Sequence, residues 1–424
     1  MSKNIPVKWS SNLTIYEVNL RQYTKSGTFR EFREHLPRLK NLGAGILWFM
    51  PLQPIGVIER KGTLGSYYSI RDYLAIDPLY GTMDEFRDLV DHIHAMGMFV
   101  ILDWVANHTA WDNELTISHP DFYTLNEEGG FRPPFPEWAD VIKLNYDNPK
   151  LRRYMVESMK FWLKYTGIDG FRCDMANLVP TDFWEYARIE INKVKPVFML
   201  AEAEQWELVN SAFDAVYNWN LFHTMNDIAR GKKSAWDLKS MIEREIYQFP
   251  SHAYQMMFIS NHDENSWNGS EIERLGYGLE TFAVLYFTLT GIPLIYSGQE
   301  AGFHKRLSFF EKDEIEWKDD KMFPFYSKLT GLKKSNEAIW NGPYGGELIM
   351  LDTNNGGNTI AYIRQKSNHK ILVILNLTGY DQFAHLNDNR VEGYYADLFS
   401  EEKYTIYNEY YFSLTPWGYK VLHF

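Results

Sequence analysis

Short apolar runs alternate with longer amphipathic stretches along the chain up to about residue 340. The apolar runs have the length and the flanking turn residues of buried β-strands. They predict strands at 14–18, 45–50, 98–104, 170–174, 197–202, 215–219, 256–260 and 293–297. The stretches between them predict helices, for example at 83–96, 148–166 and 276–290. In the first of these, Phe86, Leu89 and Ile93 recur at helical spacing.

Eight strands, separated by helix-length segments, favour a closed parallel (β/α)8 TIM barrel of the α/β class. Parallel strands need crossover helices, and closure removes both edges of the sheet. An open doubly wound sheet is the alternative. In a barrel of this kind, functional side chains lie at the C-terminal ends of the strands.

A long interval with little periodicity, 107–145, follows the third predicted strand. It contains Pro120, Gly129-Gly130 and Pro133-Pro134-Phe-Pro136. A loop of this length is usually functional or an inserted subdomain. We expect it to cover the active face of the barrel.

From residue 341 the pattern changes to a period of two with turn signals, which predicts a C-terminal antiparallel β-sandwich. Its strands are expected at 347–352, 359–364, 370–376, 394–398 and 411–422, with a hairpin turn at 354–358. The predicted organisation is a catalytic barrel over 1–106 and 146–340, an inserted domain over 107–145 and a C-terminal domain over 341–424.

Composition excludes several classes of partner. The formal net charge of −12 argues against nucleic acid, which needs a basic surface. The single cysteine, Cys173, excludes an intrachain disulfide and a cysteine metal cluster. No apolar run reaches the roughly 18 residues of a membrane span, and the first residues lack a signal pattern. No membrane partner is therefore expected, and the expected location is the cytoplasm unless a signal peptide has been removed.

Polar side chains end four of the predicted strands: Asp103 to His108, Arg172 with Asp174, Glu202, and Asn261-His262-Asp263. Any one of these groups could be a solvated charge or a structural ion pair. Because the C-terminal ends of barrel strands meet on one rim, the coincidence of all four predicts an active site there.

Arg172 and Asp174 are two residues apart on one strand, so their side chains should point to the same face. A guanidinium beside a carboxylate keeps the carboxylate ionised near neutral pH. An ionised, oriented aspartate is the group that attacks the sugar carbon in covalent glycosidase catalysis.

Glu202 ends the next strand, and neighbouring strands lie about 4.8 Å apart. Such a pair matches the separation of about 5–5.5 Å between the carboxyl groups of retaining glycosidases, whereas inverting enzymes need a wider gap for water. The sequence therefore predicts Asp174 as the nucleophile and Glu202 as the acid and base. Glu204 stands two residues after Glu202, so its side chain should point to the same face, and it is the alternative candidate for the acid/base role.

A metal site is the competing chemistry. His108, His262 and nearby carboxylates are possible ligands, but no His-x-x-x-His or cysteine pair stands at a usable spacing. No metal is therefore expected among the site residues.

Four motifs occur in order on the predicted strands: Asp103-x-x-x-Asn107-His108, Gly170-Phe-Arg172-x-Asp174, Ala201-Glu202-Ala203 and Asn261-His262-Asp263. Supporting motifs are Tyr68-x-x-x-Asp72-Tyr73, Ile76-Asp77-Pro78 with Gly81-Thr82, and Tyr296-Ser-Gly-Gln299-Glu300. With these motifs, the sequence resembles the α-amylase family, glycoside hydrolase family 13, over essentially its whole length.

The resemblance implies a role for each matched residue. Asp174 would be the nucleophile, Glu202 the acid/base and Asp263 a stabiliser of the transition state. A substrate subsite would be lined by Tyr68, His108, Arg172 and His262, with Asp103 as a structural or subsite carboxylate. The long interval would be the family's domain B, and the tail its β-sandwich domain C.

Many members of the family bind calcium between barrel and domain B, through an aspartate and a histidine. The corresponding places here read Val141-Ile-Lys143-Leu-Asn145 and Leu178. Because a lysine ammonium could replace the charge of the cation, no calcium is expected at this place, and no cofactor elsewhere.

The first expected function is hydrolysis of α-1,4 bonds in α-glucans and maltooligosaccharides. Lys143-Leu-Asn145 and Asp174-Met-Ala-Asn177 also resemble the neopullulanase and cyclomaltodextrinase branch, which accepts α-1,6 bonds as well. That branch usually dimerises through an extra N-terminal domain. The chain starts almost at its first strand, without such a domain, so the branch is placed second and a monomer is expected.

Two further alternatives use the same site differently. A 4-α-glucanotransferase would pass the covalent intermediate to a sugar acceptor instead of water. A non-catalytic glycan-binding relative would keep the barrel without its acids. All three carboxylates are present, which argues against this last alternative.

Overall fold

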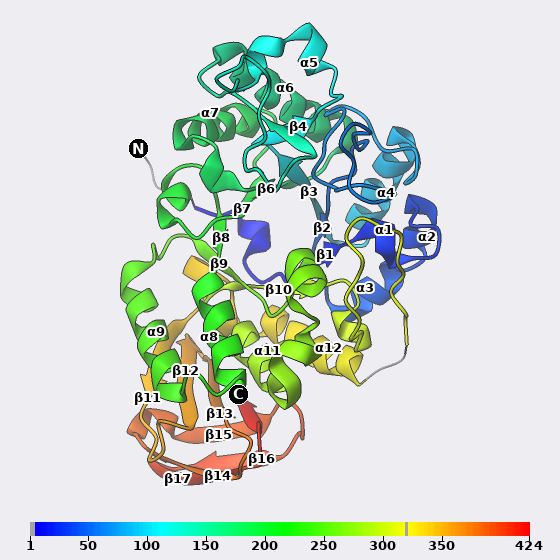
Figure 1. Ribbon diagram of the computed structural model, residues 1–424. Helices are drawn as coiled ribbons and strands as arrows, with labels where there is room; N and C mark the ends of the chain where they lie inside the picture. Colours follow the sequence, from blue (N-terminus) through cyan, green and yellow to red (C-terminus); the bar gives the residue numbers. More distant parts are fainter. Residues whose placement is uncertain (1–4, 319–320) are drawn as a thin grey trace. The chain divides into compact units, whose positions relative to one another are not determined.

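The computed structural model describes residues 5–318 and 321–424 (Figure 1). Eight strands form a closed parallel barrel in the order β1-β10-β9-β8-β7-β6-β3-β2. They are β1 (Ile15–Val18), β2 (Ile46–Phe49), β3 (Phe99–Val105), β6 (Gly170–Asp174), β7 (Phe198–Ala201), β8 (Ala215–Tyr217), β9 (Tyr254–Met257) and β10 (Ile292–Tyr296). The TIM-barrel prediction is confirmed, and the open doubly wound alternative is wrong.

Helices follow most of these strands. They are α1 (Leu20–Tyr23), α2 (Phe29–Arg33), α3 (Leu36–Leu42), α4 (Met83–Ala95), α5 (Leu115–Ser118), α6 (Pro149–Thr166), α7 (Thr181–Asn192), α8 (Trp219–Ala229), α9 (Ala235–Gln248), α10 (Glu271–Leu275), α11 (Leu279–Thr288) and α12 (Met322–Ser335). The helix predicted at 276–290 begins as a 3-10 turn and is α-helical only in α11. None of the helices in the described ranges combines the length and the apolar character that a bilayer crossing requires.

Local sequence explains where the long helices begin and end. In α4, Thr82 and Glu85 form a capping box, and the predicted apolar stripe is buried. In α6, Asn148 caps the first turn and Pro149 occupies the first helical position, where its missing N–H leaves no hydrogen bond unmade. Gly167 ends α6 in the left-handed conformation and turns the chain toward β6.

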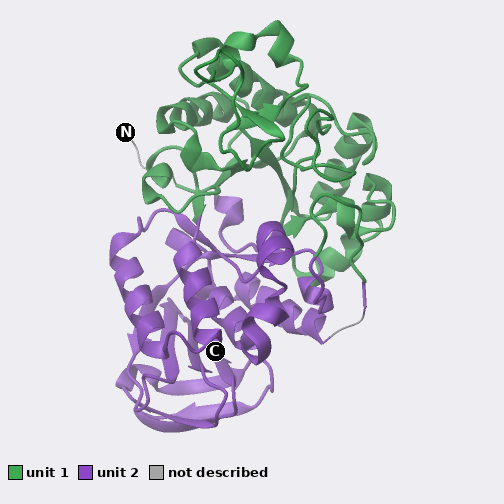
Figure 2. Cartoon of the chain, viewed as in Figure 1, with its two compact units in different colours: residues 1–7, 16–216, 307–316 green, residues 8–15, 217–306, 317–424 purple. Residues whose placement is uncertain are grey.

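The chain divides into two compact units (Figure 2). Unit 1 comprises residues 1–7, 16–216 and 307–316, and unit 2 comprises residues 8–15, 217–306 and 317–424. The strands β2, β3, β6 and β7, with the residues that follow them, therefore belong to unit 1. The strands β9 and β10 belong to unit 2.

The interval after β3 contains a small sheet of its own in unit 1. Strands β4 (His108–Ala110) and β5 (Val141–Lys143) pair antiparallel, with His108 opposite Lys143. The segment between them thus leaves β4 and returns beside it in β5. The predicted limits of the inserted domain, 107–145, stay a prediction, as do those of the other two domains.

The C-terminal part of unit 2 is antiparallel, as predicted. A sheet in the order β11-β12-β13-β18-β15-β16 consists of Glu347–Leu351, Thr359–Lys366, His369–Asn376, Tyr419–His423, Gly393–Asp397 and Lys403–Ile406. A two-stranded sheet pairs β14 (Gln382–Asn387) with β17 (Glu409–Leu414). Apolar side chains from both sheets share one buried core, so the two sheets form a sandwich.

Three details of this part differ from the prediction. Strands β14 and β16 were not expected from the sequence, because β14 buries Gln382 and exposes Phe383, and β16 has only four residues. The strand expected at 411–422 is two strands, β17 and β18. The turn between them contains Pro416 and Trp417, which has a positive φ of 53°.

Gly170 permits the contact between the two strands that carry the candidate acids. A Cβ at this position would lie 1.9 Å from the carbonyl oxygen of Phe198 on β7. Gly170→Ala should therefore push β6 and β7 apart and lower the free energy of unfolding by at least about 1–3 kcal/mol, measured by urea denaturation. The matched control is Gly331→Ala in α12, where a Cβ meets nothing within 4 Å and should not destabilise the protein. Equal stability of both variants would contradict this reading.

Candidate active site

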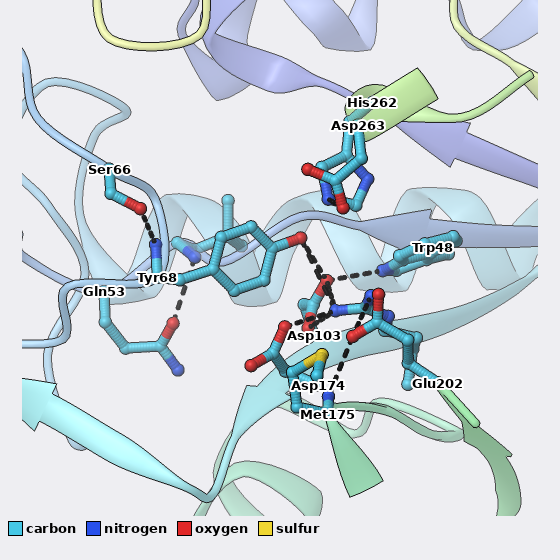
Figure 3. A network of polar contacts seen from close by, with 12 residues as sticks. Trp48, Gln53, Ser66, Tyr68, Asp103, Asp174, Met175, Glu202, His262 and Asp263 are labelled. Carbon is cyan, nitrogen blue, oxygen red and sulfur yellow. Dashed lines mark hydrogen bonds and ion pairs between the residues drawn. The ribbon is translucent and has the colours of Figure 1, made fainter. Parts of the chain in front are cut away.

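Asp103, Asp174 and Glu202 lie close together in one network of polar contacts (Figure 3). The guanidinium of Arg172, in unit 1, joins all three. Its Nη1 lies 2.9 Å from Oδ1 of Asp103 and 3.1 Å from Oδ1 of Asp174. Its Nη2 lies 2.9 Å from Oε2 of Glu202. The structure therefore brings three predicted carboxylates around one buried cation, which is itself a predicted site residue.

The register of three neighbouring strands produces this convergence. On β3 and β6, Asp103 stands opposite Arg172. On β6 and β7, Cys173 stands opposite Ala201, and the backbone N–H of Glu202 continues the ladder by donating to the Cys173 carbonyl. Arg172 and Asp174 share a face as predicted, while Cys173 is fully buried.

Exposure distinguishes the three carboxylates. The side chain of Asp103 has no exposed surface, and besides Arg172 it accepts hydrogen bonds from Trp48 Nε1 at 3.1 Å and the Tyr68 hydroxyl at 3.3 Å. The side chains of Asp174 and Glu202 are 8% and 11% exposed. Asp103 is thus an internal anchor, whereas Asp174 and Glu202 can meet a ligand.

Glu202 has a second fixed partner in the backbone. The N–H of Met175 donates to its Oε2 at 2.8 Å. Met175 has a φ of 41°, the left-handed region that a non-glycine residue adopts at a cost of about 1–3 kcal/mol and that occurs often at active sites. The rival residue Glu204 is exposed. The contacts with Arg172 and Met175 hold the Glu202 carboxyl in the cluster, and its acid/base role stays a prediction.

His108 and Tyr68 adjoin this cluster from two other segments. The Tyr68 ring lies 5.6 Å from the Arg172 guanidinium, and the ring of Phe309 stacks on it with 6.4 Å between centroids. His108 is buried at the start of β4, and the indole of Trp138 meets its ring edge-on at 5.6 Å. Burial lowers the pKa of His108 to about 4, although the negative charge of Asp140 opposes the shift. His108 is therefore a neutral hydrogen-bonding group at neutral pH.

The remaining two predicted residues, His262 and Asp263, lie in unit 2 after β9. Nε2 of His262 is 3.2 Å from Oδ2 of Asp263. His262 is buried, and the side chain of Asp263 is 38% exposed. Asp263 thus has a carboxylate that is accessible within its own unit.

Sequence reasoning missed three residues near the cluster. Trp48 on β2 donates to Asp103, Met175 donates to Glu202, and Phe309 stacks on Tyr68. Trp48 stands at the C-terminal half of a predicted strand, which was an available signal. Met175 acts through its backbone and Phe309 is distant in sequence, so neither left a comparable signal.

Within the part of the chain that the structure describes, no three His, Cys, Asp or Glu side chains gather as a metal site. The expected absence of calcium beside domain B stays a prediction. In that region the ammonium of Lys61, rather than that of Lys143, lies 2.8 Å from a buried carboxylate, that of Asp140.

The model of the α-amylase catalytic domain matches residues 14–128 and 137–340. The chain belongs to the α-amylase family. This member is an amylase-type glycoside hydrolase, and the matched region includes all eight predicted site residues.

Three relatives illustrate the range of similarity. The solved structure of a noncanonic maltogenic α-amylase, AmyB, from Thermotoga neapolitana has a TM-score of 0.90 and 30% identity, covering 97% of this chain and 98% of that one. A cyclomaltodextrinase of a Bacillus species is 28% identical over 387 residues, which are 81% of this chain and 64% of the relative. The α-amylase 2 of Dictyoglomus thermophilum is 25% identical over 439 residues, 94% of this chain and 74% of the relative. The chain thus spans less than two thirds of the cyclomaltodextrinase.

The buried neutral state of His108 predicts a loss of stability in acid. The unfolded chain binds a proton at His108 below pH of about 6.5, whereas the folded protein binds it only below the folded pKa of about 4. The free energy of unfolding should therefore fall by about 3 kcal/mol as the pH decreases through this window. In His108→Gln this part of the pH dependence should disappear, measured by urea denaturation between pH 7 and pH 4. The exposed His304, changed to Gln, is the control and should keep the wild-type profile; a wild-type profile in His108→Gln would refute the assignment.

Proposed function

We propose that this member of the α-amylase family is a retaining hydrolase of maltooligosaccharides and cyclic glucans, cleaving α-1,4 and α-1,6 bonds. The observation that carries the catalytic part is the contact of Asp174 and Glu202 with one guanidinium. The similarity to a cyclomaltodextrinase and to a maltogenic α-amylase supports the substrate class. These relatives fit the second sequence-based expectation better than the first, the plain α-1,4 hydrolase.

In the proposed mechanism, Asp174 attacks the anomeric carbon while Glu202 protonates the glycosidic oxygen. The bond between the anomeric carbon and the glycosidic oxygen breaks, and the aglycone leaves as an alcohol. The sugar is then an ester of Asp174. Glu202, now a carboxylate, removes a proton from water, and the resulting hydroxide displaces Asp174. Two inversions retain the configuration at the anomeric carbon.

Arg172 supports both steps electrostatically. Its charge favours the ionised form of Asp174 before attack and of Glu202 after proton transfer. A preorganised cation needs little rearrangement when charge moves from one carboxylate to the other.

The other predicted residues would bind the substrate. His108 and Tyr68 would hold the glucose unit next to the cleaved bond, the first by hydrogen bonds and the second by its ring. Asp263 and His262 would bind sugar hydroxyls in the transition state, as the family resemblance implies.

An α-amylase acting on long α-1,4 chains is the second candidate. The similarity to α-amylase 2 of Dictyoglomus thermophilum, over 94% of this chain, favours it. It differs from the first candidate in its preference for polymers and in its inability to cleave α-1,6 bonds.

Substitution of the two acids tests the mechanism. Glu202→Gln should lower kcat on a maltooligosaccharide by about 10²–10⁴-fold, and Asp174→Asn should lower it at least as far. The exposed neighbour Glu204→Gln should keep nearly full activity. Proton NMR of the first products should show retention of the anomeric configuration. Inversion, or an active Asp174→Asn, would rule out the covalent route.

A timed product profile on amylose, pullulan and a cyclodextrin tests the substrate class. We expect the cyclodextrin and pullulan to be cleaved, with panose among the pullulan products, and amylose to be slower. Amylose cleavage alone would favour the α-amylase candidate. Products longer than a maltooligosaccharide substrate would identify a glucanotransferase instead.

A further inference from the structure

Lys61 joins three segments of unit 1 that are far apart in sequence. Its Nζ lies 2.8 Å from Oδ1 of Asp140 and donates to the carbonyl of Glu137 at 2.7 Å. The same ammonium lies 6.0 Å from the ring centre of Phe310. The lysine thus connects its own loop to segment 137–140 and adjoins segment 307–316.

The loop that carries Lys61 is fixed to segment 307–316. The N–H of Leu64 donates to the Phe310 carbonyl at 3.0 Å, and the N–H of Thr63 donates to Oε1 of Glu311 at 2.9 Å. Arg60 closes the loop on itself by donating from Nε to the Gly56 carbonyl at 2.7 Å. The position of the Lys61 backbone is therefore determined by groups other than the ammonium.

The two segments that meet at Lys61 each bring an aromatic ring to the candidate active site. Segment 137–140 contains Trp138, whose indole contacts His108. Segment 307–316 contains Phe309, whose ring is nearly parallel to that of Tyr68, with 14° between planes. Both rings are only half-buried, and rings of this kind stack on the apolar faces of sugars.

The contact with Asp140 lets Lys61 act on the segment of the first ring, together with the hydrogen bonds that Ser69 and Trp111 donate to the carbonyls of Asp140 and Ala139. The side chain of Asp140 is only 7% exposed, so its charge needs a cation nearby. Without Lys61, the carboxylate would gain by moving into water. Because Trp138 is two residues away, such a movement would displace its indole from His108.

We propose that Lys61 is a positioning residue for substrate binding: it holds Trp138 against His108 and keeps it in place relative to the Tyr68 and Phe309 pair. The proposal rests on the proposed function, since it assigns the two rings to the binding of glucose units. It implies that Lys61 acts on the affinity for the glucan more than on the bond-breaking step.

A double-mutant cycle tests the proposal. Lys61→Met removes the charge and keeps the length of the side chain. We expect it to raise KM for a maltooligosaccharide by about tenfold while kcat changes much less. Asp140→Asn should relieve the uncompensated charge, so the double variant should be no worse than Lys61→Met. Lys160→Met is the matched control, because Lys160 also contacts two acidic side chains, Glu157 and Glu190, between α6 and α7.

Hydrogen exchange provides a readout that does not depend on activity. Backbone amides of residues 131–143 should exchange faster in Lys61→Met than in wild type or Lys160→Met, without substrate present. Unchanged exchange, additive effects of the two substitutions, or a fall in kcat without a rise in KM would overturn the proposal. If the wild type cleaves no glucan but the exchange result holds, the proposed function fails and the positioning of Trp138 stands.

Discussion

The burial of one guanidinium is the constraint on which the site depends. Arg172 has no exposed side-chain surface, and a buried cation costs several kcal/mol unless ionised partners surround it. The planar fork of arginine can reach partners on both sides, which a lysine cannot do. The partners here come from three adjacent strands, so the charge is stable only when β3, β6 and β7 are in register. The rings of Trp48 and Tyr68, at 5.0 and 5.6 Å, add cation–π contacts.

The exposure of the three carboxylates separates the structural one from the two that a ligand can reach. Asp103 is saturated by Arg172, Trp48 and Tyr68, so it has little capacity left for a ligand. Asp174 and Glu202 share the same cation but retain some exposed surface. The neutral His108 nearby adds hydrogen-bonding capacity without another charge. One ion network thus fixes the barrel rim and presents two acids to the same point.

The barrel and most of the site could be predicted because both are encoded locally. Buried parallel strands are continuous apolar runs, and the polar residues of the site stand at their C-terminal ends, as Asp174 does on β6. In the sandwich, β14 buries Gln382 and exposes Phe383, and β16 is only four residues long, so the sequence did not indicate these strands. The contacts of Lys61 and Phe309 join segments up to some 250 residues apart. No local sequence pattern predicts which distant segments will be in contact.

The hydrogen bond from Met175 to Glu202 has a genetic consequence. The donor is a peptide N–H, so every amino acid except proline supplies it. Codon changes at this position can alter the side chain and the ease of reaching the left-handed conformation, yet they leave the donor itself in place. One of the two fixed contacts of the Glu202 carboxylate therefore survives every substitution at position 175 except proline.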